Sequence, residues 1–329
     1  MKSGIAREET TVLKAISILT VIITHANGMK AFVGVPVLFD SKITSILCQG
    51  GMCTFLILSG YGLYSSYVEH GFENWWDRKI IKLFIPAMII QIIWFFIFSF
   101  YTYYKEGHIT ISWSTVIGDI LCVNQVNGID GSIWYLSYLL FCYVVFYFCF
   151  RLLSDRKAFP AFVLLWIGLM PIAKSCWRNS FYCISSFCIG VVWGRIASKY
   201  EIQMNRCVKI MGVIFSVAVN VYYYQIFRVS WLKDNVASNI LAMGFILLFS
   251  MIDCKKLKVL SFFGENSFML YLLQGKTICK FPYSDFKTGI LRVILFLIVL
   301  ALSIVMASII NYMIKHMSSI RQNYWKKNE

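Results

Sequence analysis

The chain of 329 residues is 59% hydrophobic and only 14% charged, and its mean hydropathy is +0.68. No soluble domain of this length needs so much apolar surface, so the composition excludes a soluble globular protein and indicates a polytopic membrane protein. The net charge of +15 does not require nucleic acid as a partner, because basic loops can lie against anionic membrane lipid.

Hydropathy predicts an all-α protein with about ten transmembrane helices, organised as a single transmembrane domain over residues 1–329. The expected spans are residues 11–29, 43–67, 80–101, 132–150, 158–176, 181–196, 208–227, 236–252, 261–274 and 289–315. The sixth and the ninth are short for a bilayer crossing. Only short ends fall outside the spans, so no appended soluble domain is expected.

Basic residues set the expected orientation of these spans. With the N-terminus inside, 20 of the 31 Lys and Arg residues fall in inner segments, which agrees with the positive-inside rule. Both termini are therefore predicted to be cytoplasmic, in a multi-pass protein of the cell's inner membrane. Glu8, Glu9 and Lys14 interrupt the first apolar stretch and no small-residue cleavage site follows, so this stretch is expected to be a retained span.

The first span contains two ionisable side chains, Lys14 and His25. Eleven residues make about three helical turns, so both project from nearly the same face, roughly 16 Å apart along the axis. Ser17 and Thr24 fall close to that face, and this polar stripe predicts a helix that lines a water-filled or substrate-filled cavity. The alternatives are a hydrogen-bonded structural role for His25 and a Lys14 side chain that reaches the inner surface.

Arg78, Lys79 and Lys82 form a second basic group where the third span begins, just before Pro86. On a helix they cover about a third of the circumference at the cytoplasmic surface. Several cations together suit a polyphosphate ligand. Positive-inside anchoring explains the same charges equally well.

The longest stretch outside the spans is 102–131, on the expected outer face. Within it, residues 113–121 are weakly amphipathic and residues 124–131 are rich in turn formers. Long ordered loops often carry function, so this segment is a candidate cover for an outward-facing substrate site. A short interfacial helix anchored by Trp113 is the alternative.

The eleven cysteines predict neither disulfides nor a metal centre. Most lie inside the expected spans, where cysteine behaves as a small apolar residue. No CxxC pair occurs and the four histidines are far apart, so no metal site is expected. The sequence also has no P-loop, dinucleotide-binding glycine pattern or GxSxG motif.

Five motifs, in order and over nearly the whole chain, resemble the membrane acyltransferase 3 family. They are Lys14 with His25, Phe55-Leu-Ile-Leu-Ser59-Gly60-Tyr61, Arg78-Lys79-Ile-Ile-Lys82 ahead of Pro86, Ser132-Ile-Trp134-Tyr135-Leu136, and Gly264-Glu-Asn-Ser267 leading to Tyr271-Leu-Leu. Each motif alone is weak. Their order carries the resemblance.

The resemblance implies an integral membrane O-acyltransferase. Family members move an acyl group, usually acetyl from cytoplasmic acetyl-CoA, to a hydroxyl of an extracytoplasmic glycan. It implies acetyl-CoA as donor with no permanently bound cofactor, and a cell-surface polysaccharide or its lipid-linked precursor as acceptor. It also implies catalytic roles for His25 and Lys14, and contacts between the CoA phosphates and Lys79 and Lys82, with Arg78 adjacent.

The chain departs from the family pattern at four positions. Lys14, Lys79 and Lys82 stand where the family usually has Arg, and lysine lacks the bidentate fork that matches phosphate. Gln274 stands where the late helix often has His. Because Gln exchanges no proton near neutral pH, an acid-base role at that position is excluded.

His25 fits acyl transfer, because a neutral imidazole can take the hydroxyl proton or carry the acyl group itself. Ser59, Trp134, Tyr135, Ser267 and Tyr271 are weaker candidates for substrate contacts. The alternatives are close helix packing for Ser59, as for Gly60 and Gly62, and membrane-interface anchoring for Trp134 and Tyr135. A transporter or flippase for a lipid-linked glycan is the alternative function. A glycan polymerase lacks the large outer loop it would need.

Overall fold

The computed structural model describes residues 4–32, 40–108, 113–121, 133–176, 182–201, 204–225 and 230–328. Within these ranges the chain forms helices joined by turns, and no strand occurs. The expectation of an all-α membrane protein is confirmed. The turn-forming run 124–131 and Ser132 lie outside the described residues.

The helices in chain order are α1 (Arg7–Gly28), α2 (Ser41–His70), the π-helix η2 (Trp76–Ile81), α3 (Lys82–Glu106), α4 (Trp113–Ile120), α5 (Trp134–Leu152), α6 (Asp155–Cys176), α7 (Ser186–Lys199), α8 (Arg206–Gln225), α9 (Trp231–Phe249), α10 (Lys258–Glu265), α11 (Ser267–Gln274) and α12 (Gly289–Asn328), with short 3₁₀ turns at η5 (Cys254–Lys256), η6 (Ile278–Lys280) and η7 (Tyr283–Asp285).

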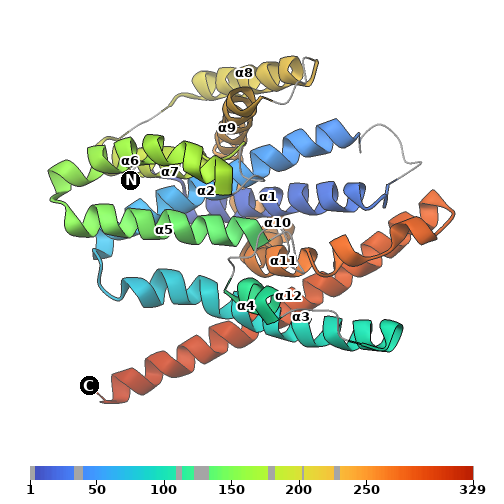
Figure 1. The fold of residues 1–329 in the computed structure, drawn as a ribbon. Helices are drawn as coiled ribbons and strands as arrows, with labels where there is room; N and C mark the ends of the chain where they lie inside the picture. Colours follow the sequence, from blue (N-terminus) through green and yellow to red (C-terminus); the bar gives the residue numbers. More distant parts are fainter. Residues whose placement is uncertain are drawn as a thin grey trace.

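Eight of the described helices are long and apolar enough to cross a membrane. They correspond to eight of the ten expected spans. The sixth expected span is α7, which has 14 residues, and the ninth is split into α10 and α11 of eight residues each. Ten crossings and cytoplasmic termini therefore remain predictions. Both chain ends lie toward the same side of the bundle (Figure 1).

Local sequence explains where several helices begin and end. The Asp40 carboxylate accepts hydrogen bonds from the backbone N–H groups of Lys42 and Ile43, which caps the start of α2. Gly107 ends α3 with φ of 74°, a left-handed conformation that favours glycine. α3 is therefore longer than the expected span 80–101. The expected short helix at 113–121 is present as α4.

Asn266 divides the ninth expected span. Its side-chain amide donates to Phe262 O at 2.9 Å, and Ser267 Oγ donates to Gly264 O at 2.8 Å. Asn311 of α12 donates to Glu265 O and to Asn266 Oδ1. Side chains thus satisfy the backbone groups that the break frees, as a membrane interior requires.

Close packing through glycine positions α1 and α2 at the centre of the bundle. A Cβ atom on Gly51 of α2 would overlap Thr20, and one on Gly264 of α10 would overlap the backbone of Thr11. α1 is therefore held between α2 and α10. These two close contacts fix the rotation of α1 about its own axis. They thereby fix which face of α1 contacts neither α2 nor α10.

The α2–α7 crossing also depends on glycine. A Cβ on Gly60 would overlap Phe187 O, and a Cβ on Gly190 would overlap Ile57 O. At Gly62, two residues further along α2, an added Cβ would meet no atom within 4 Å. The packing interpretation therefore holds for Gly60 and not for Gly62.

We expect Gly60→Val to destabilise the protein and Gly62→Val, its matched control, to leave stability nearly unchanged. Overpacking a tight contact typically costs about 1–3 kcal/mol. Thermal unfolding of both purified variants in detergent measures the difference. Equal losses of stability would contradict the glycine-dependent crossing.

Candidate active site

His25 and Gln274 meet across the centre of the bundle. His25 lies in the last turn of α1 and Gln274 ends α11, and His25 Nδ1 is 2.5 Å from Gln274 Oε1. An amide oxygen only accepts hydrogen bonds, so in this pair Nδ1–H donates. His25 Nε2 then keeps its lone pair, and it makes no hydrogen bond within the described ranges. This is the tautomer that a base or nucleophile at Nε2 requires.

Gln274 is fully buried at the end of an apolar helix. Its Oε1 also accepts from Cys279 Sγ at 3.5 Å, while its Nε2 is buried with no hydrogen-bond partner among the described residues. A buried donor without a partner costs about 1–3 kcal/mol. The amide therefore orients His25 through its oxygen and has N–H groups left for a ligand.

The sequence-based interpretation excluded proton exchange at Gln274 and assigned it no other role. The structure places it as the residue that orients His25. The two positions are 249 residues apart, so no local spacing could have paired them. The one sequence feature that pointed to Gln274 was its position three residues after Tyr271.

Lys14 and Ser17 extend the site along α1 toward its N-terminus. Lys14 is half-buried and makes no hydrogen bond or ion pair within the described ranges. Ser17 is fully buried, and its Oγ has no hydrogen-bond partner in the same part of the chain. Together with His25 Nε2, these atoms give α1 a run of polar groups with unused hydrogen-bonding capacity.

Three of the weaker candidates, Ser59, Tyr135 and Tyr271, come together beside this pair. The ring of Tyr135 in α5 lies 5.1 Å from the ring of Tyr271 in α11, measured between centroids. The Ser59 side chain in α2 lies close to the Tyr135 side chain. Because Tyr271 is one turn before Gln274 on α11, this cluster lies next to Gln274, the partner of His25.

Trp134 packs against this cluster. Its ring packs edge-on against Tyr135 and Tyr182, with centroids 6.1 and 6.4 Å away. Trp134 and Tyr135 are both buried within the protein, so anchoring at a lipid-exposed interface is wrong for them. Ser267 is not part of the cluster, since its hydroxyl caps the break between α10 and α11.

The predicted basic group lies on the π-helix η2 and the first residue of α3. Pro86 has no N–H to donate to the carbonyl of Lys82, and its ring crowds that turn, which favours a widened turn just before it. Trp75 stacks on Phe146 of α5 with centroids 5.7 Å apart, which holds η2 against the bundle. Lys79 is half-buried and Lys82 is exposed; the Arg78 side chain lies outside the described residues.

This basic group is separate from His25. The end of α2 and the start of α3 lie on the side of the bundle where α1 begins, whereas His25 is near the other end of α1 (Figure 1). Along α1, Lys14 lies between the start of the helix and His25. The structure therefore places the predicted residues in two groups toward opposite ends of α1.

Lys276 was missed because a lysine directly after an apolar run looks like the polar end of a span. It is buried, and its Nζ donates to Leu272 O at 3.1 Å. In the following loop, burial raises the pKa of Tyr283 to about 12, with a smaller effect from nearby Cys279. Lys276 thus places a buried amino group two residues from Gln274.

Comparison with protein families finds a family model that matches most of the chain. This family, described as an acyltransferase domain of the acyltransferase 3 type, covers residues 8–312. That range includes all the candidate site residues. Comparisons with curated proteins and with solved structures find no match.

The His25–Gln274 pair predicts a fixed imidazole tautomer. In the intact protein, ¹⁵N NMR of labelled histidine should show neutral His25 protonated at Nδ1 and not at Nε2. Gln274→Met removes the acceptor and should let both tautomers appear. His108, an exposed residue, is the internal reference. A His25 spectrum that is unchanged in Gln274→Met would contradict the pairing.

Proposed function

The chain belongs to the acyltransferase 3 family and is a membrane acyltransferase. On this premise, we propose that it transfers an acetyl group from cytoplasmic acetyl-CoA to a hydroxyl group. The proposed acceptor is an extracytoplasmic polysaccharide or its lipid-linked precursor. The observation that carries this proposal is His25, held through Nδ1 by Gln274, with no hydrogen bond at Nε2 from any described residue. A membrane-embedded imidazole in this state suits proton removal from a hydroxyl.

Direct transfer needs only groups at this site. His25 Nε2 takes the proton of the acceptor hydroxyl as its oxygen attacks the thioester carbonyl. The C–S bond then breaks, the new ester leaves, and the proton passes from Nε2 to the departing CoA thiolate. Throughout, the hydrogen bond from Nδ1 to Gln274 Oε1 keeps Nε2 directed at the reacting oxygen.

A covalent route uses the same nitrogen. Nε2 attacks the thioester carbonyl, the C–S bond breaks, and CoA leaves as its thiolate. The acceptor hydroxyl then attacks the acyl carbonyl, its proton passes to the CoA thiolate, and the C–N bond breaks to release the ester and neutral His25. Both routes need a neutral ring with a free Nε2. Trapping the protein with acetyl-CoA in the absence of acceptor distinguishes them, because only the covalent route leaves an acetyl group on His25.

The positive groups fit a donor that enters from the cytoplasm. Arg78, Lys79 and Lys82 would bind the CoA phosphates at the surface, and the pantetheine arm would extend past Lys14 and Ser17 toward His25. The separation of Lys14 and His25, roughly 16 Å along α1, suits an extended arm. Support for this path comes from Ser17 Oγ and Lys14, which have unused hydrogen-bonding capacity among the described residues.

Replacing His25 by Ala should abolish acyl transfer while the protein still inserts and accumulates. Loss of a general base typically costs about two to four orders of magnitude. Transfer of radiolabelled acetyl by purified protein measures the loss, and His108→Ala, at an exposed position just after α3, is the control. Near-normal transfer by stable His25→Ala protein would refute the mechanism.

Neutralising Lys79 and Lys82 together should weaken acetyl-CoA binding far more than acceptor binding. Each charge-assisted contact contributes about 1.5–3 kcal/mol. Lys79→Arg and Lys82→Arg should keep or improve affinity, because the guanidinium fork matches phosphate. Lys157→Gln with Lys199→Gln removes two exposed charges elsewhere as a control. Unchanged donor affinity in the folded Lys79→Gln, Lys82→Gln protein would assign these lysines to lipid anchoring.

A further inference from the structure

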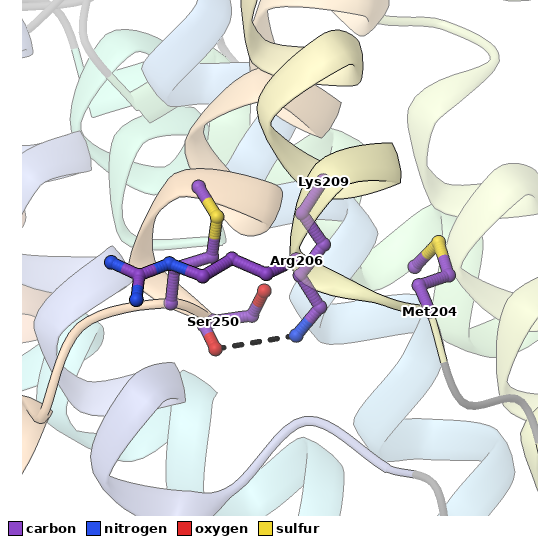
Figure 2. Close-up of a pocket in the computed structure, with 5 residues that line it drawn as sticks. Met204, Arg206, Lys209 and Ser250 are labelled. Atoms are coloured by element: carbon purple, nitrogen blue, oxygen red, sulfur yellow. Dashed lines mark hydrogen bonds between the residues drawn. The ribbon is translucent and has the colours of Figure 1, made fainter.

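A pocket far from His25 lies where α8 begins and α9 ends. It has a volume of about 260 Å³ and is lined by Met204, Arg206, Lys209, Ser250 and Met251 (Figure 2). None of the lining residues is acidic, whereas two are basic. The acyl-transfer proposal uses none of these residues.

The two basic side chains, Arg206 and Lys209, lie on either side of Ser250. Lys209 Nζ donates to Ser250 O at 3.3 Å, which uses one of its three N–H donors. The Arg206 guanidinium lies on the other side of Ser250 in this view (Figure 2). Neither cation forms an ion pair within the described ranges. Five N–H donors on Arg206 and two on Lys209 therefore remain for an anion.

Helix α8 adds to the positive potential of the pocket. Arg206 is its first residue, and its 20 residues direct the positive end of the helix dipole toward the pocket. Asn205 caps this end through Oδ1, which accepts from Val208 N–H at 2.9 Å. An oxyanion is thus favoured by two side chains and by the helix terminus together.

The surface next to the pocket is apolar and faces outward. α8 lies at the edge of the bundle (Figure 1), and Val208, Met211, Ile214 and Phe215 are all exposed along it. On a membrane protein such a face contacts lipid chains. The pocket therefore joins an anion-binding end to a lipid-facing helix surface.

We propose that this pocket binds the phosphate group of an anionic phospholipid, with the acyl chains lying along the exposed face of α8. The positive-inside count places Arg206 and Lys209 on the cytoplasmic side, where anionic headgroups attract basic residues. Free inorganic phosphate would satisfy the cations but would leave the adjoining apolar face without a role.

The test titrates purified full-length protein in neutral detergent with dioctanoyl phosphatidylglycerol and with dioctanoyl phosphatidylcholine, using native mass spectrometry to obtain Kd. Phosphatidylglycerol should bind at one site and phosphatidylcholine should not. Arg206→Gln with Lys209→Gln should raise Kd about 25-fold, or about fivefold for each cation. Arg206→Lys with Lys209→Arg keeps the charge and should retain binding.

The matched control is Lys255→Gln with Lys258→Gln, which removes two exposed charges that do not line the pocket. Its Kd should stay within about twofold of the unmodified protein, well below the effect of two specific contacts. The proposal is overturned if both double variants lose affinity equally, if phosphatidylcholine binds as tightly, or if inorganic phosphate displaces the lipid at equal concentration. An unchanged Kd in Arg206→Gln with Lys209→Gln also overturns it.

Discussion

Inside a bilayer, polar groups must find partners within the protein, because no water is present to hydrogen-bond them. The α7–α9 contact meets this demand with side chains. Ser185 Oγ donates to Asn235 Oδ1 at 2.5 Å, Ser186 Oγ donates to Asn239 Oδ1 at 2.8 Å, and Asn239 Nδ2 donates to Asn235 O at 2.7 Å. Such a network fixes two helices against each other and leaves little capacity for a ligand.

The central face of α1 shows the opposite balance. Ser17 Oγ and Gln274 Nε2 are buried, and within the described ranges neither they nor His25 Nε2 make a hydrogen bond. The α7–α9 contact shows that this chain can supply hydrogen-bond partners for buried polar groups. A lack of suitable residues therefore does not explain the unsatisfied groups at α1. Within the described ranges, buried polar atoms without a partner also occur at Gln91, Ser99 and Asn220, so the contrast supports the proposed site at α1 but does not by itself locate it.

The sequence predicted the parts that depend on local chemistry. Eight spans follow from apolar length, and His25 follows from the cost of placing an imidazole among apolar residues. Gln274 could not be paired with His25, because that contact depends on how α11 packs against α1. The division at Asn266 was also missed, since its backbone partners are supplied partly by Asn311 from a different helix.

The amide at Gln274 also determines how the site responds to the membrane potential. An imidazole paired with a carboxylate would hold a fixed negative charge inside the membrane, where the transmembrane voltage acts with about 2.3 kcal/mol per charge for each 100 mV crossed. With the neutral imidazole that base catalysis requires, the imidazole–amide pair carries no net charge, so the electrical field exerts no net force on it. The orientation of His25 is thereby independent of whether the membrane is energised or depolarised.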